Sequence, residues 1–349
     1  MTVKSLYMAR TALYLPLSNY LKLCALLLCL PWCSATAGDM TSTLLIGGSR
    51  IDVTIESGKL KVSQADLLHW VQSAAEAVAT YYGRYPVPHV GIRIIPIDGS
   101  GIRHGQTFGY DGGFIKIRVG SETLPSELAD DWMLTHEMVH LGFPSVAEEH
   151  HWMEEGIAVY VEPIARIQAK QMEASRMWAD LARDMPKGVP GPNDKGLDRT
   201  HTWASTYWGG ALFCFLADVE IRQRTHNQKG LQDALRGILN AGGDIRQDWN
   251  LDDALKAGDH ATGTSVLAEL YAKMKDRPMD VDLAATWKQL GIESDGRTVR
   301  LNDDAPLAAI RRSITSVDSA KPVQPTSSLR PSAVFAGRSV DSPQQLERP

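Results

Sequence analysis

Residues 134–144 read LTHEMVHLGFP, with two histidines four positions apart and a glutamate directly after the first. In a helix, positions four apart lie one turn above each other on the same face, so His136 and His140 can present ring nitrogens to one metal ion. Glu137 is rotated by about 100° from His136, which lets it miss the ion and reach a water molecule beside it. The stretch therefore predicts a helix that carries a zinc site, with Glu137 as general base and acid.

The third zinc ligand must come from outside this helix, because a catalytic zinc site has three protein ligands and keeps one position for water. His150 and His151 are candidates in an expected loop, and Glu154 and Glu155 open the next helix. Successive helical positions point about 100° apart, so at most one of the two glutamates can face the ion. The residues alone leave all four candidates open.

A resemblance to a known group narrows this choice. The stretches HEMVH (136–140) and WMEEGIAVYVE (152–162) resemble the gluzincin metallopeptidases, which include thermolysin and aminopeptidase N. They are most similar to short exported relatives of the glycyl aminopeptidase family. In that pattern the Glu before the Gly is the third ligand, which assigns one zinc ion (Zn²⁺) to His136, His140 and Glu155. The resemblance implies a thermolysin-like catalytic core and a peptide or protein substrate.

Two further segments extend the resemblance. Residues 205–211, STYWGGA, are similar to the aminopeptidase element Tyr-x-Lys-Gly-Ala, whose tyrosine donates a hydrogen bond to the oxyanion. This similarity assigns that role to Tyr207. Residues 105–120, GQTFGYDGGFIKIRVG, occupy the place of the edge strand that binds substrate in gluzincins. There, Gly112 and Gly113 would let a peptide backbone approach closely.

The chain also departs from the aminopeptidase pattern. Gly209 stands where that branch has Lys, fourteen residues separate His140 from Glu155, and the Gly-x-Met-Glu-Asn element that captures a free N-terminal amine is absent. We expect an exported, aminopeptidase-like zinc peptidase. The alternative is a catalytically silent periplasmic peptide-binding or assembly factor with the same fold.

Hydrophobic periodicity predicts the fold class. Before Pro125, strands are expected at 50–56, 90–97 and 112–120, together with one long helix at 63–83; nearly every later segment has helical period. We predict an α+β fold. Residues 38–125 form a small sheet with a long helix and an edge strand, and residues 126–315 form a mainly helical part that carries the zinc site. Pro163 is expected to bend or end the helix that contains Glu155.

Residues 1–37 have the pattern of a cleaved secretory signal. Basic side chains precede an apolar run from Leu23 to Trp32, and small residues follow up to Ala37. The run is shorter than the roughly 20 residues that a membrane-spanning helix needs. We therefore expect a periplasmic or secreted protein with no membrane span after cleavage, and a lipid anchor on Cys33 is the alternative.

The predicted mature chain is acidic. The full sequence has 36 Lys and Arg residues, of which three lie in residues 1–37, a segment without Asp or Glu; the mature chain therefore has 33 basic and 41 acidic side chains and a net charge of −8. Nucleic acid is therefore not an expected partner. Only Cys214 remains of four cysteines, so His and carboxylate side chains must bind the metal. Residues 316–349 are rich in Pro and predict a disordered tail. The sequence leaves the oligomeric state open.

Overall fold

The structure, a computed structural model, describes residues 38–317. The predicted signal at 1–37 and residues 318–349 of the predicted tail lie outside the described residues. Within residues 38–317, no helix combines the length and the apolar character that crossing a lipid bilayer requires.

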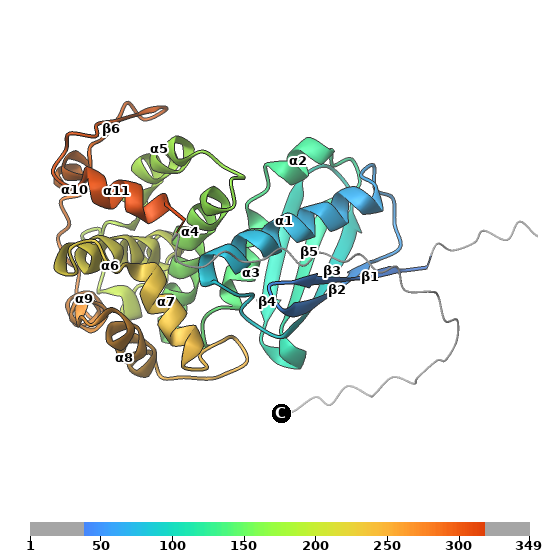
Figure 1. Ribbon diagram of the computed structural model, residues 1–349, viewed down its shortest axis with the longest axis horizontal. Coiled ribbons are helices and arrows are strands. Elements are labelled where there is room, and N and C mark those ends of the chain that lie inside the picture. Colours follow the sequence, from blue (N-terminus) through green and yellow to red (C-terminus); the bar gives the residue numbers. More distant parts are fainter. Residues whose placement is uncertain (1–37, 318–349) are drawn as a thin grey trace, which may run out of the picture. The chain divides into compact units, whose positions relative to one another are not determined.

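The N-terminal part is a five-stranded sheet with the long helix α1 (Gln64–Tyr82) packed on it (Figure 1). Its strands are β1 (Met40–Ile46), β2 (Ser49–Ile55), β3 (His89–Ile97), β4 (Ile102–Phe108) and β5 (Phe114–Gly120). Their order in the sheet is β1-β2-β3-β5-β4. The three inner strands are parallel to one another, and each edge strand is antiparallel to its neighbour. One edge is therefore β1, and the opposite edge is β4.

Helix α1 begins and ends where the sequence predicts. The Ser63 side chain accepts a hydrogen bond from the Asp66 N–H, and the Asp66 carboxylate accepts one from the Ser63 N–H, which together form a capping box. At the other end Gly83 has φ 79°, a left-handed conformation that favours glycine. Between these caps the helix buries Trp70, Val71 and Val78 among other side chains.

The rest of the described chain is mainly helical. It contains α2 (Pro125–Ala129), α3 (Met133–His140), α4 (His151–Gln168), α5 (Ala174–Asp184), α6 (Gly210–Arg224), α7 (Leu231–Asn240), α8 (Leu251–Thr262), α9 (Val266–Met274), α10 (Leu283–Leu290) and α11 (Ala308–Thr315), with a hairpin of β6 (Ile292–Ser294) and β7 (Val299–Leu301). The structure confirms the predicted mixture of a small N-terminal sheet and a helical remainder.

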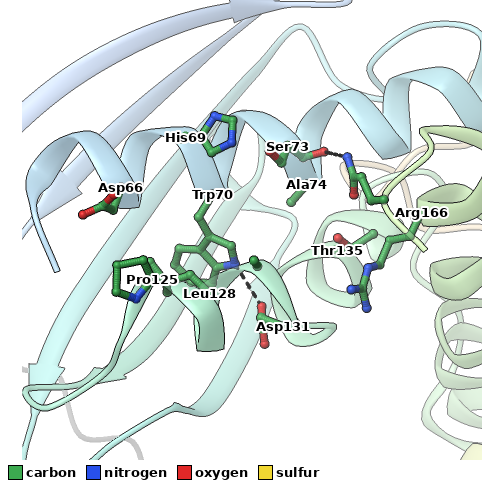
Figure 2. Close-up of a pocket in the computed structure, with 12 residues that line it drawn as sticks. Asp66, His69, Trp70, Ser73, Ala74, Pro125, Leu128, Asp131, Thr135 and Arg166 are labelled. Carbon is green, nitrogen blue, oxygen red and sulfur yellow. Dashed lines mark hydrogen bonds between the residues drawn. The ribbon is translucent and has the colours of Figure 1, made fainter. Parts of the chain in front are cut away.

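Two helix boundaries differ from the prediction. Residues 126–140 have a continuous helical period, but the helix is interrupted between α2 and α3, because the Asp131 carboxylate accepts hydrogen bonds from the N–H groups of Met133 and Leu134 and starts a new helix. The indole N–H of Trp70 donates to the same carboxylate at 3.1 Å (Figure 2). Of the two outcomes predicted for Pro163, an end of α4 is wrong, since the helix continues through Pro163 to Gln168.

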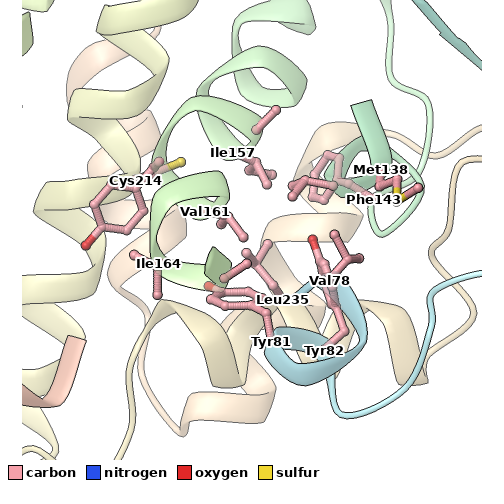
Figure 3. Close-up of a cluster of buried hydrophobic side chains, with 14 of the residues drawn as sticks. Val78, Tyr81, Tyr82, Met138, Phe143, Ile157, Val161, Ile164, Cys214 and Leu235 are labelled. Atoms are coloured by element: carbon pink, nitrogen blue, oxygen red, sulfur yellow. The ribbon is translucent and has the colours of Figure 1, made fainter. Parts of the chain in front are cut away.

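A shared apolar core fixes the helices that carry the candidate site. Figure 3 shows Tyr82 of α1, Met138 of α3, Val161 of α4, Cys214 of α6 and Leu235 of α7 in one buried cluster, and each is at most 4% exposed. Protein interiors are close-packed, so small displacements of these helices would open cavities or create clashes. The core therefore holds α3 and α4 in fixed relative positions.

Candidate metal centre

Three of the predicted residues converge in the structure. His136 and His140 of α3 and Glu155 of α4 each offer a ligand atom, and these atoms lie within 4.8 Å of one another. The Glu155 Oε2 atom is 3.2 Å from His136 Nε2 and 3.8 Å from His140 Nε2. Tetrahedral zinc with bonds of roughly 2.0–2.1 Å separates its ligand atoms by about 3.4 Å. The three donors thus have the spacing of a zinc site.

The protonation states also suit a metal ion. Burial, assisted by the neighbouring His136, lowers the pKa of His140 to about 3, so this imidazole is neutral near pH 7. Burial alone would raise the pKa of Glu155, but hydrogen bonds with His136 and His151 outweigh it and hold that pKa well below its usual range. His136 Nδ1 is a buried atom that has no hydrogen-bond partner within residues 38–317. A neutral imidazole and an ionised carboxylate are the forms that zinc binds.

The other candidates for the third ligand have different partners. His150 Nδ1 lies 3.0 Å from Asp198 Oδ1. His151 lies between two carboxylates, with Nδ1 at 2.9 Å from Glu154 Oε2 and Nε2 at 3.3 Å from Glu155 Oε1. The structure places His151 and Glu154 behind the Glu155 carboxylate. His151 precedes Glu155 by four residues on α4, and this helical spacing is the signal in the sequence from which the contact could have been predicted.

Glu137 faces the edge strand β4. Its carboxylate accepts a hydrogen bond from Thr107 Oγ1 at 2.6 Å, and its side chain is 7% exposed. A Cβ atom on Gly105 would lie 2.6 Å from both Cγ and Oε1 of Glu137, so only glycine leaves room for this carboxylate. Burial raises the pKa of Glu137, and the Thr107 hydrogen bond partly offsets this effect. Neither Thr107 nor Gly105 was predicted from the sequence as part of the site.

Tyr207 lies close to the same cluster, although it is about 50 residues later in the sequence than Glu155. It lies in a π-helical segment, Ala204–Gly209, directly before α6, where the sequence predicted ordinary helix. Burial raises the pKa of Tyr207 to about 12, and the negative charges of Glu155 and Glu137 act in the same direction. The phenol therefore keeps its proton near pH 7 and can donate a hydrogen bond beside the metal ligands. Single π turns inside helices occur frequently at functional sites.

Two glycines set the position of Tyr207 relative to Glu155. A Cβ on Gly156 would lie 2.2 Å from the carbonyl carbon of Gly210, and a Cβ on Gly210 would lie 2.0 Å from the carbonyl oxygen of Trp152. The backbones of α4 and α6 are thus in direct contact beside Glu155 of α4 and close to Tyr207, which lies in the segment just before α6. The glycines are required here for close packing.

The two glycines predicted to bind substrate lie in a turn and not in an edge strand. Gly112 and Gly113 have φ values of 92° and 121° and form the turn between β4 and β5. A Cβ at Gly112 would meet His89, and one at Gly113 would meet Leu141. Strand β5 is hydrogen-bonded on both sides, to β3 and β4, so it cannot pair with a peptide. The edge strand beside the cluster is β4, which reaches Glu137 through Gly105.

Comparisons with known proteins concern the fold. No protein-family model and no curated protein matches the sequence. The structure is similar to an aminopeptidase N family protein from Idiomarina loihiensis, with TM-score 0.55 and 12% identity, covering 73% of this chain and 49% of that chain. It is also similar to an M1 zinc metallopeptidase from Deinococcus radiodurans, with TM-score 0.47 and 15% identity, covering 70% and 53% of the two chains. The chain spans about half the length of these structures, and it shares the fold of the matched part of the aminopeptidase N family protein.

Proposed function

We propose that this chain is an exported zinc-dependent peptidase of the aminopeptidase-like type. The observation that carries the proposal is the convergence of two imidazoles and one carboxylate, from His136, His140 and Glu155, on one point. Structural zinc sites usually have four protein ligands, whereas this set of three leaves a coordination position for water or substrate. The fold shared with an aminopeptidase N family protein supports the same class of reaction.

The side chains around the cluster supply the remaining chemistry. A zinc ion held by the three ligands would supply Lewis acidity that makes water reactive near neutral pH. Glu137 accepts a proton from the attacking water and delivers it to the amine that leaves. The raised pKa of Glu137, which follows from its burial, brings this group closer to the working pH. Tyr207 donates a hydrogen bond to the oxygen of the former carbonyl group, where negative charge develops.

The sequence of the edge strand is relevant to whether the enzyme is an aminopeptidase, which removes N-terminal residues, or an endopeptidase, which cuts internally. Strand β4 reads IRHGQTF and contains no Asp or Glu, so it offers no carboxylate for a free N-terminal amine. Peptides with free and acetylated N-termini would separate the two modes of cleavage. If acetylation stops cleavage, the enzyme is an aminopeptidase; if acetylated peptides are cut internally, it is an endopeptidase.

The central test is metal analysis combined with hydrolysis of a peptide library, read by mass spectrometry. We expect one zinc ion per chain and cleavage that a chelator abolishes. Glu137→Gln should keep the zinc and lose about 10²–10⁴-fold in rate, because a general acid–base group contributes about that much. The exposed Glu148→Gln is the matched control and should retain full activity. Zinc binding without any hydrolysis would contradict the proposal and favour a peptide-binding factor.

A further inference from the structure

A cavity of about 330 Å³ opens directly beside the metal cluster. Its wall includes His136 of the cluster and Tyr207, and it extends between α4 and α5 to the segment before α6. Ligand pockets in proteins have volumes of about 300–1,000 Å³. The cavity is therefore large enough for a substrate group and begins at the residues proposed to act on the scissile bond.

The charged groups of the wall compensate one another. Arg166 pairs with Glu162 at 3.1 Å, Arg183 with Asp180 at 2.7 Å, and Lys187 with Asp184 at 2.8 Å. Arg176 likewise pairs with Asp130. These pairs include every Asp, Glu, Lys and Arg of the wall, all of which lie in the described part of the chain. The wall thus carries four acidic and four basic groups that balance, so it does not select for one sign of charge.

The apolar part of the wall contains unusually exposed aromatic side chains. Trp132 is 51% exposed and Trp203 is 60% exposed, and both line the cavity. Trp203 stacks on Tyr207 with ring centroids 5.8 Å apart, and Trp132 meets the His136 ring edge to face at 5.4 Å. Val159 and Met172, both partly exposed, contribute aliphatic surface. Large apolar surfaces left open to water around a cavity mark a binding site for apolar groups.

We propose that this cavity binds a large apolar side chain, aromatic or of the Leu and Met type, on the substrate residue next to the scissile bond. This inference rests on the proposed peptidase function and adds the substrate class. Trp203 and Trp132 connect the pocket to the reacting groups, since each contacts one residue of the site. Occupying the pocket would thus cover the exposed indole faces and place the neighbouring peptide bond at the metal cluster.

The first measurement compares peptides that differ only in the residue beside the cleavage position. The protein should cleave Phe, Trp, Leu and Met peptides at least about tenfold faster, in kcat/KM, than Ala, Asp or Lys peptides, because an apolar pocket discriminates about 10–200-fold for each group it binds. Mass spectra of the products show on which side of the cleaved bond the preferred residue lies.

Two variants test the pocket itself. Trp203→Ala removes an exposed indole that lines the cavity. Val159→Phe adds a larger side chain that fills the cavity from α4, at a position one helical turn after Glu155. In both variants the ratio of kcat/KM for Phe over Ala peptides should fall about tenfold or more. Leu45→Ala is the control, because Leu45 is a similarly exposed apolar side chain on β1, the edge of the sheet opposite to β4. It should leave the ratio unchanged.

A binding measurement separates failure of the pocket from failure of the proposed function. In Glu137→Gln, which is expected to bind without turnover, a Phe peptide should change the tryptophan fluorescence and an Ala peptide should not. Hydrolysis with a preference for small or charged residues, or with a ratio that neither variant alters, would overturn the pocket and leave the peptidase intact. If no peptide is hydrolysed but Phe peptides bind selectively, the peptidase proposal is overturned and the pocket proposal stands. If there is neither hydrolysis nor selective binding, both proposals are overturned.

Discussion

His151 Nε2 lies 3.3 Å from Glu155 Oε1, while the other carboxylate oxygen, Oε2, faces the imidazoles of His136 and His140. His151 is itself oriented by Glu154, whose Oε2 is 2.9 Å from Nδ1. Partners behind a metal ligand fix its orientation and tune its affinity for the ion. The carboxylate of Glu155 is therefore aimed by a residue of its own helix.

Replacing His151 should weaken zinc binding. In His151→Ala, the dissociation constant of zinc, measured by competition with a chelator, should rise about 10–100-fold. His151→Gln should recover part of the loss because its amide N–H can still donate to Glu155. His260→Ala, at an exposed histidine of α8, is the control. Equal zinc affinity in His151→Ala and the parent would show that Glu155 needs no such partner.

Gly105→Ala should strongly slow turnover while the zinc stays bound. The added Cβ would occupy space 2.6 Å from Glu137 Oε1, and the flexible carboxylate would have to move away from the reacting water. We expect a loss of at least about 10²-fold in kcat, the contribution of a general base. Gly191→Ala, where the nearest atom is 3.9 Å away, is the matched control. A fully active Gly105→Ala enzyme would refute the position of Glu137.

Tyr207→Phe should slow the chemical step. Loss of the phenol O–H removes a donor to the developing oxyanion, which typically costs about 10²–10³-fold in kcat. The KM for a good substrate should change little, because the aromatic ring that stacks on Trp203 is retained. Steady-state kinetics with equal zinc content check this. Tyr110→Phe, at a 51% exposed tyrosine, should behave as the parent, and a Tyr207→Phe variant that matches it would exclude the oxyanion role.

Asp198→Ala should destabilise the start of α4. Asp198 accepts hydrogen bonds from Trp152 at 2.8 Å, from Tyr271 at 2.8 Å and from His150 at 3.0 Å. Leaving these donors without an acceptor should lower the free energy of unfolding by about 2–4 kcal/mol. Urea denaturation measures the change. The exposed Asp280→Ala is the control, and a loss no larger than in this control would contradict the role of Asp198.

Local signals in the sequence predicted the helices that matter most. The spacing of His136 and His140 placed both rings on one face of α3, and the caps at Ser63 and Gly83 gave α1 to within one residue at each end. The resemblance to gluzincins selected Glu155, the candidate that the structure brings to both imidazoles. These features depend on neighbouring residues, so the sequence carries them directly.

Features that depend on distant contacts were missed. Strand β4 reads IRHGQTF, without clear alternation of apolar and polar residues, and it becomes a strand by pairing with β5. The break before α3 depends on Asp131 and its contact with Trp70, 61 residues earlier. Pro163 did not end α4, because Ile164 and Ala165 beyond it are buried in the core and favour continuation of the helix. Tertiary packing outweighs local propensity in each case.

Because of the glycine contact between α4 and α6, a single substitution could affect zinc binding and the catalytic rate to different extents. All three proposed ligands lie before Gly156, whereas Tyr207 reaches the cluster only because Gly210 lets the two backbones touch. A side chain at position 210 would collide with the backbone of α4 and force the two helices apart, which increases the distance between the phenol of Tyr207 and the carboxylate of Glu155. A bulkier residue at position 210 should therefore lower the turnover rate more than the affinity for zinc, because His136 and His140 lie on a third helix, α3.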